Sequence, residues 1–145
     1  MRVTDYTDFA LRVLVYLGTT GDRLVTIDEI AGSCAISRNH LMKIVHRLGQ
    51  LGYLATVRGK NGGVRLGAPP QRIKVGDVVR DLEGGLDVPA AKTSRSTTDP
   101  AQAVRAILRE AFASFASVLD ATTLADLVQP CLRAKSREAP RGRTR

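Results

Sequence analysis

The sequence predicts a mainly α-helical fold with a small β-hairpin wing and a long helix behind it. Three observations support this expectation. Apolar residues recur at helical spacing over residues 4–17 and 36–51, as they do on helices that bury one face. The period then changes to two, which is typical of strands, at 53–57 and 64–66, on either side of a glycine-rich turn. A second long helical pattern covers residues 101–119.

Capping residues predict where the first three helices begin. Ser, Thr and Asp side chains at such positions accept a hydrogen bond from the first free amides of a helix. Thr4 or Thr7 is expected to cap the first helix. Thr26, with a glutamate three residues later, has the capping-box pattern and predicts a short second helix. Ser37 is expected to cap the third helix. Helix, tight turn, helix and hairpin together indicate a winged helix-turn-helix.

The rest of the chain predicts a tight turn and three further helices. Asn61-Gly62-Gly63 is expected to supply the positive φ values that a tight hairpin needs. Helices are expected over residues 75–82, 101–119 and 122–128, the last of which ends before Pro130. The chain then divides into four parts: a winged helix-turn-helix module (1–83), a loop without periodicity (84–100), the long helix with the short one after it (101–129), and a basic tail expected to be disordered (130–145).

The net charge of the chain, +8, comes from one third of the sequence. Between Glu29 and Asp77 there is no acidic residue, while eight Lys and Arg residues occur there. The remainder carries fourteen basic and fourteen acidic residues, which cancel. These charges are spaced through apolar periodic segments and are not bunched in a tail. The pattern therefore favours a module that binds double-stranded DNA over a merely solvated basic face.

Composition argues against several other classes of protein. No segment approaches the roughly 20 apolar residues that a membrane span needs, and the N-terminal sequence lacks the apolar run of a signal peptide. The two cysteines, Cys34 and Cys131, form neither a disulfide framework nor a metal-ligand spacing, so we expect a cytoplasmic protein. No Ser/His/Asp or Cys/His arrangement is visible, and both histidines, His40 and His46, fall on the third helix. We therefore expect that the protein is not an enzyme.

The third helix is expected to enter the major groove of DNA by its N-terminal end. Arginine and asparagine side chains can hydrogen-bond guanine and adenine edges there, and the hairpin tip suits phosphates or a narrow minor groove. The expected DNA contacts are Ser37, Arg38, Asn39, His40, Lys43 and Arg47 on the helix, and Arg58, Lys60, Asn61 and Arg65 on the hairpin. A structural role is at least as consistent with the position of His46. The expected core positions of this helix are Leu41, Ile44, Val45 and Leu48.

The long helix carries an apolar stripe that requires a partner. Its members recur at helical spacing and are Val104, Ile107, Leu108, Ala111, Phe112, Phe115 and Leu119. A helical arm that left this stripe in water would expose a contiguous apolar patch, which soluble proteins avoid. The stripe therefore predicts an interface with a second copy of the chain, a homodimer.

Three segments carry specific motifs, namely residues 4–12, 36–43 and 57–66. The second contains Arg38-Asn39-His40, and the third contains the glycine-rich hairpin tip. Together they resemble the Rrf2 family of transcription regulators, and within it most closely the NsrR branch of nitric-oxide-responsive repressors. The resemblance implies a homodimeric repressor that binds a partly palindromic operator, with the long helix as the dimer interface.

The chain departs from the family pattern in the loop before the long helix. Family members with an iron–sulfur cluster carry three cysteines there, and the corresponding positions in this chain hold Ala91, Ser96 and Gln102. The irons of such clusters are held by thiolates, which these side chains cannot supply. Asp8 matches an acidic ligand of some relatives, and without thiolates we interpret it as a surface or capping carboxylate. We therefore expect a repressor with no cluster, no metal site and no cofactor.

Two alternatives remain open at the level of the sequence. The protein could be a non-specific architectural binder, because phosphate contacts alone give affinity for DNA. It could also respond to redox change or nitric oxide through Cys34 or through an atypical cluster. A cysteine at this position is more often a small core residue.

Overall fold

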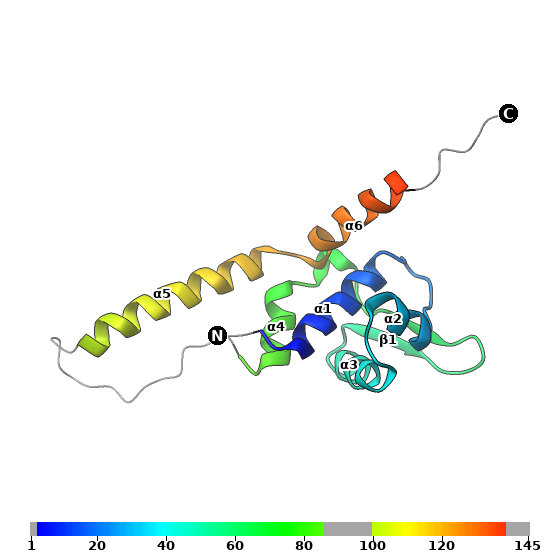
Figure 1. Cartoon of the computed structure of the whole chain (residues 1–145), viewed down its shortest axis with the longest axis horizontal. Helices are drawn as coiled ribbons and strands as arrows, with labels where there is room; N and C mark the ends of the chain where they lie inside the picture. Colours follow the sequence, from blue (N-terminus) through cyan, green and yellow to red (C-terminus); the bar gives the residue numbers. More distant parts are fainter. Residues whose placement is uncertain (1–2, 86–99, 139–145) are drawn as a thin grey trace.

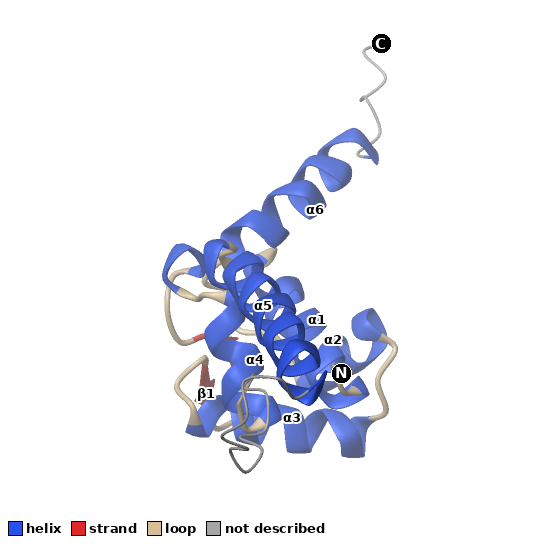
Figure 2. Ribbon diagram, turned by 90° about the vertical axis from the view of Figure 1, so that its left-hand side faces the viewer, coloured by secondary structure: helices blue, strands red, loops and turns tan. Residues whose placement is uncertain are grey.

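The structure is a computed structural model that describes residues 3–85 and 100–138. Its elements are α1 (Asp5–Gly18), α2 (Ile27–Cys34), α3 (Arg38–Gln50), β1 (Leu54–Val57), β2 (Gly63–Leu66), the 3-10 helix η1 (Pro70–Arg72), α4 (Val75–Glu83), α5 (Pro100–Ala121) and α6 (Leu124–Glu138). Helices α1 to α4 and the hairpin gather into one body, and α5 extends away from it (Figure 1). Seen from the side, the molecule is almost entirely helical (Figure 2). The predicted fold class is confirmed.

Side-chain caps begin the first three helices as the sequence predicts. The hydroxyl of Thr4 accepts a hydrogen bond from the Thr7 amide at 3.3 Å, so Thr4, and not Thr7, is the cap of α1. Thr26 accepts from the Glu29 amide at 3.2 Å, and Ser37 accepts from the His40 amide at 3.3 Å. Each of these bonds satisfies an amide that has no partner within its helix.

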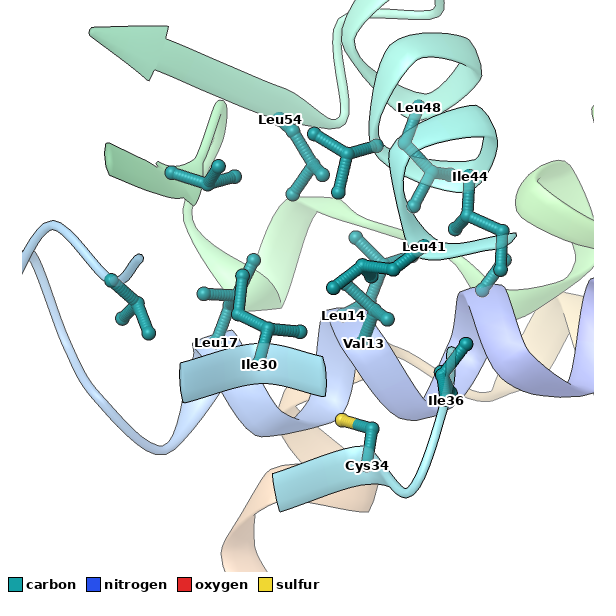
Figure 3. Packing of buried hydrophobic residues seen from close by; sticks show 14 of the residues in the cluster. Val13, Leu14, Leu17, Ile30, Cys34, Ile36, Leu41, Ile44, Leu48 and Leu54 are labelled. Atoms are coloured by element: carbon teal, nitrogen blue, oxygen red, sulfur yellow. The ribbon is translucent and has the colours of Figure 1, made fainter. Parts of the chain in front are cut away.

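The core forms around one face of α1. Val13, Leu14 and Leu17 have no exposed surface, and they face Ile30 of α2 and Leu41 of α3 (Figure 3). All four predicted core positions of α3 are buried, which confirms the helical period. Burial of apolar area stabilises the fold by about 25 cal/mol for each Å² removed from water, so this cluster holds the three helices together.

The hairpin is an antiparallel pair in which Thr56 lies opposite Val64. Its buried residues turn towards the core, and the loop before α2 joins it through Val25. The Val25 amide donates to the Val64 carbonyl at 2.9 Å, and the Val64 amide donates back at 2.8 Å. These two bonds join the hairpin to the segment that leads into α2.

The turn of the hairpin differs from the one predicted. Asn61, Gly62 and Gly63 do not have positive φ; Gly59 does, at +113°. The glycine at position 62 is required for a different reason, because a Cβ there would collide with the carbonyl oxygens of Val57 and Gly59. The loop has more residues than a tight two-residue turn, and its left-handed residue therefore falls near the start of the loop and not at the end.

The last helix is longer than the sequence predicts. Helix α6 continues through Pro130 to Glu138, so the expected end before Pro130 and the expected disorder of residues 130–138 are wrong. Proline removes one backbone hydrogen bond and usually breaks a helix. Here α6 is held on α1 on both sides of the proline: Val128 is buried against Gly18, and the Lys135 ammonium donates to the Thr19 hydroxyl at 3.0 Å. The same ammonium lies 5.8 Å from the Tyr16 ring centroid. Residues 139–145 and 86–99 lie outside the described part of the chain.

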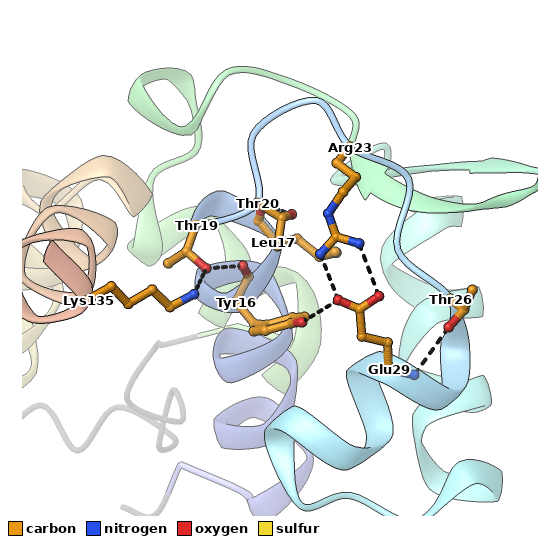
Figure 4. A network of polar contacts seen from close by, with 8 residues as sticks. All are labelled: Tyr16, Leu17, Thr19, Thr20, Arg23, Thr26, Glu29 and Lys135. Carbon is orange, nitrogen blue, oxygen red and sulfur yellow. Dashed lines mark hydrogen bonds and ion pairs between the residues drawn. The ribbon is translucent and has the colours of Figure 1, made fainter. Parts of the chain in front are cut away.

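A polar network ties the loop after α1 to α2 and α6 (Figure 4). Glu29 accepts hydrogen bonds from the Arg23 guanidinium at 2.6 and 3.0 Å and from the Tyr16 hydroxyl at 2.9 Å. The bonds from Arg23, followed by the one from Tyr16, lower the pKa of Glu29 to about 2. Since Lys135 lies over the same Tyr16 ring, the network connects α6 with the first turn of α2.

An ion pair fixes the direction of α5. The guanidinium of Arg80 on α4 donates to both carboxylate oxygens of Asp120 on α5, at 2.7 and 2.5 Å. Backbone bonds secure the same junction, since the Val75 amide donates to the Thr122 carbonyl at 3.0 Å. Gly76 lies directly beneath the Asp120 carboxylate, where any Cβ would collide with it.

The substitution Gly76→Ala should weaken this junction. Asp120 is held by Arg80, so it cannot move away from a new Cβ without breaking the ion pair. We expect the free energy of unfolding to fall by about 1–3 kcal/mol, the usual cost of overpacking, as measured by urea denaturation. The control is Gly32→Ala in α2, where a Cβ meets nothing within 4 Å; it should be neutral or stabilising because alanine favours helix. Equal stabilities for the two variants would contradict this account.

Candidate nucleic-acid interface

One side of α3 is buried and the other forms an exposed polar edge. The exposed residues, which we call the α3 edge, are Arg38, Asn39, Met42, Lys43, His46, Arg47 and Gln50. They recur at intervals of three and four residues, so they share one face of the helix. No acidic side chain occurs on this edge, and it carries three of the predicted basic residues.

The hairpin places a second basic group beside α3. Arg58, Lys60, Asn61 and Arg65 are all exposed, as predicted. The ribbon of α3 lies next to β1 of the hairpin, at the lower right of the molecule in Figure 1. Between them is a hollow of about 720 Å³, whose lining includes Arg38, Met42, His46, Val57 and Arg58. One predicted residue of the helix, Arg38, and one of the hairpin, Arg58, therefore line the same hollow.

Two of the predicted contacts have other partners. The His40 ring packs edge-on against Phe9, with ring centroids 5.2 Å apart, and lies 6.0 Å from the Tyr6 ring centroid. His40 is thus half-buried. It does not belong to the α3 edge, because its side chain points towards α1. The Ser37 hydroxyl is occupied as the cap of α3. His40 therefore holds α3 against α1, and Ser37 caps the start of the helix.

Arg47 lies at the border of the interface, close to α4. Its Nη2 group donates to the Asp81 carbonyl at 3.4 Å, while the residue as a whole stays exposed. The Tyr53 hydroxyl donates to the Asp81 carboxylate at 2.7 Å, and burial together with this bond raises the pKa of Tyr53. These contacts hold the C-terminal half of α3 against α4, which orients the arginine towards the side of the interface.

The structure adds residues that the sequence pattern did not single out. Met42 is 50 % exposed, lies one turn after Arg38 and lines the hollow. Apolar side chains in the major groove contact the thymine methyl group. Asp28, in the first turn of α2, forms an ion pair with Arg38 and also lines the hollow. The position of Met42 four residues after Arg38 could have indicated that both share one face of the helix. Nothing in the local sequence indicates that Asp28 pairs with Arg38.

The thiols and Asp8 do not form a centre for an iron–sulfur cluster. Cys34 is only 9 % exposed, and burial raises the pKa of its thiol. Asp8 forms an ion pair with Arg12 at 2.6 Å. A hollow of about 600 Å³ is lined by Asp8 and both cysteines. Within residues 3–85 and 100–138, however, no three His, Cys, Asp or Glu side chains gather closely enough to hold a metal ion.

The positions that correspond to the cluster cysteines are only partly described. Gln102 lies in the first turn of α5, while Ala91 and Ser96 fall outside the described residues. The full sequence contains two cysteines, Cys34 and Cys131, neither of them in that loop. Because such clusters are bound chiefly through thiolates, the donor set of this chain does not fit the group.

A helix-turn-helix whose second helix presents a basic edge beside a basic hairpin defines the class of winged helix-turn-helix DNA-binding proteins. Residues 3–130 match the model of the Rrf2 family, described as an iron-dependent transcriptional regulator, and the chain belongs to this family. It is 42 % identical over 133 residues to the HTH-type transcriptional regulator NsrR of Bacillus subtilis, covering 89 % of this chain and 91 % of that one. The NsrR of Geobacillus kaustophilus is 45 % identical, with 89 % and 90 % covered.

Solved structures of other transcription regulators share the fold of this chain. The chain is similar to CymR, the global cysteine regulator of B. subtilis, with a TM-score of 0.76 and 27 % identity, covering 90 % of this chain and 98 % of that one. It is similar to IscR of T. potens, with a TM-score of 0.76, 26 % identity and 93 % and 91 % covered. The resemblance to the NsrR branch is confirmed, and the protein is a DNA-binding transcription regulator. In the part of the chain that the structure describes, no helix has the length and apolar character of a membrane span.

Proposed function

We propose that the protein is a homodimeric repressor that reads a partly palindromic operator with α3 and the hairpin, without an iron–sulfur cluster. The observation that supports the DNA-binding half is the hollow between α3 and the hairpin, which is lined by an exposed arginine of each element, Arg38 and Arg58. In this proposal, residues 1–83 bind DNA, residues 101–129 form the dimer, and the protein acts in the cytoplasm and catalyses no reaction. The loop at 84–100 lacks the ligands that it has in cluster-binding relatives.

The basic and polar residues of α3 and the hairpin have two roles in the proposal. Arg38, Asn39 and Lys43 lie at the exposed N-terminal half of α3, the part of a recognition helix that meets base edges. Contacts to phosphate set the register of the protein on the duplex and give most of the affinity. We assign them to Arg47, Arg58, Lys60, Asn61 and Arg65, all of which are exposed.

The dimer is supported by the exposed apolar surface of α5. No residue of this helix is buried within one chain, and Val104, Ile107 and Val118 are 56 %, 61 % and 66 % exposed. The predicted stripe contains the first two of these residues, and Val118 extends it towards the junction with α4. Packing α5 against its copy would bury this surface and place two recognition helices about 34–36 Å apart, the spacing of successive major grooves on one side of DNA.

Absence of a cluster is supported by the donor set and by the state of the thiols. Cys34 is buried with a raised pKa, so little of it is thiolate at neutral pH. This disfavours the alternative in which Cys34 senses redox change or nitric oxide directly. It also leaves Cys131 as the more accessible thiol in the described part of the chain.

The DNA-binding proposal predicts different effects for the helix and the hairpin. Arg38→Ala or Asn39→Ala should cost about 1–3 kcal/mol on the preferred duplex and relax the base preference at one position, because a base-edge contact is lost. Lys60→Ala should weaken binding to all duplexes alike and flatten the salt dependence, because a phosphate contact is lost. Fluorescence anisotropy against a duplex selected from a randomised library, at several salt concentrations, measures both. Normal binding by both α3 variants would show that α3 is not the recognition helix.

The dimer proposal predicts that charge on α5 will separate the subunits. The double substitution Phe112→Asp and Phe115→Asp puts like charges into the proposed interface, so we expect monomers that bind DNA weakly. Sedimentation velocity at micromolar concentration measures the assembly. Glu110→Gln, on the same helix but outside the stripe, is the control and should remain dimeric. A wild-type protein that sediments as a monomer would contradict the proposal.

The cluster proposal predicts a colourless protein that binds DNA without iron. Anaerobic purification followed by iron and acid-labile sulfide analysis should find neither in stoichiometric amount, because the chain lacks the thiolates of the loop. DNA binding by the variant with both Cys34→Ser and Cys131→Ser should be insensitive to nitric oxide. Stoichiometric iron and sulfide with charge-transfer absorption in the visible would overturn the proposal.

A further inference from the structure

The DNA-facing hollow contains one acidic residue among many neutral and basic ones. Asp28 is the one acid among the lining residues of the hollow between the α3 edge and the hairpin. It lies in the first turn of α2, just before the long segment without acids. Its carboxylate accepts from Nη1 of Arg38, the first residue of α3, and both side chains are exposed, 77 % and 60 % respectively.

Stability does not explain this pair. An exposed ion pair contributes about 0–1 kcal/mol, and the α2 N-terminus already has the Thr26 cap and the Glu29 carboxylate. A carboxylate on a surface that meets phosphates repels them and lowers affinity for every duplex. Neither stability nor general affinity for DNA therefore explains Asp28, which leaves its effect on Arg38 as its role.

We propose that Asp28 is a specificity-determining positioning residue for DNA recognition, acting through Arg38. Arginine has a long flexible side chain, and its five N–H donors allow it to bind any phosphate within reach. The bond to Asp28 holds Nη1 and leaves the donors on Nη2 and Nε for a pair of acceptors, such as O6 and N7 of guanine. This inference rests on the proposed role of α3 as the recognition helix.

The Asp28 carboxylate affects binding to the correct sequence and binding to other sequences differently, and both effects increase specificity. On the correct sequence, the oriented guanidinium meets its base edge, and Asp28 is neutralised by the arginine that it holds. On other sequences, Arg38 could reach a phosphate only by leaving Asp28, which would leave an uncompensated negative charge near the DNA backbone. Asp28 therefore lowers non-specific binding more than it lowers specific binding.

The test is a comparison of Asp28→Asn with the wild-type protein on two probes. The probes are the duplex that the wild type selects from a randomised library and a scrambled duplex of equal length, at one salt concentration. We expect Asp28→Asn to bind the scrambled duplex about three- to tenfold more tightly, since one negative charge leaves the interface. The ratio of the two dissociation constants should shrink about tenfold, as expected when one bidentate base contact is loosened.

Three controls separate positioning from charge and from folding. Glu110→Gln removes one negative charge from α5, away from the hollow, and should leave the ratio unchanged. In the Arg38→Ala background, Asp28→Asn should no longer change the ratio, because the side chain that it positions is gone. Thermal unfolding of Asp28→Asn should match that of the wild type, since the pair is exposed.

The outcomes also distinguish this inference from the proposed function. If Arg38→Ala weakens specific binding but Asp28→Asn leaves the ratio unchanged, the positioning role is wrong and the recognition helix stands. An equal change of the ratio in the wild-type and Arg38→Ala backgrounds would likewise overturn the positioning role. If Arg38→Ala and Asn39→Ala both bind the selected duplex normally, the recognition surface itself is wrong.

Discussion

Burial of one face of α1 is the constraint on which the rest of the structure depends. Val13, Leu14 and Leu17 are inaccessible to solvent because α2, α3 and the hairpin pack over them. The same helix supports α6 through Gly18, where a Cβ would collide with Val128. Helices α2, α3, α4 and the hairpin all contact α1. The core around α1 therefore positions the α3 edge, although no residue of that edge belongs to the core.

The second level of organisation is the junction between the DNA-binding body and α5. The ion pair of Arg80 with Asp120 and the hydrogen bond from the Val75 amide to the Thr122 carbonyl tie the C-terminal end of α5 to α4. In the proposed dimer, the direction of α5 sets the distance between the two recognition helices. In that dimer, the junction would set the half-site spacing that the protein accepts.

The interface itself combines exposed charges with residues that hold them in place. His40 and Ser37 secure the start of α3, through a ring contact with Phe9 and a helix cap. Arg47 connects its later half to α4 through a hydrogen bond to the Asp81 carbonyl. Asp28 belongs to this group in our proposal, but it acts from the solvent side, on Arg38. A recognition helix that is fixed on several sides loses little conformational freedom on binding, which favours specific contacts.

The sequence by itself determined the helix starts at Thr4, Thr26 and Ser37, the buried face of α3 and the basic character of one third of the chain. These features depend on neighbouring residues or on summed charge, so local hydrogen bonding and periodicity reveal them. Only the tertiary structure decided the contact of His40 with α1, the pairing of Asp28 with Arg38 and the continuation of α6 through Pro130. Each of these depends on a partner from another element, and for Pro130 that packing outweighs a strong local preference.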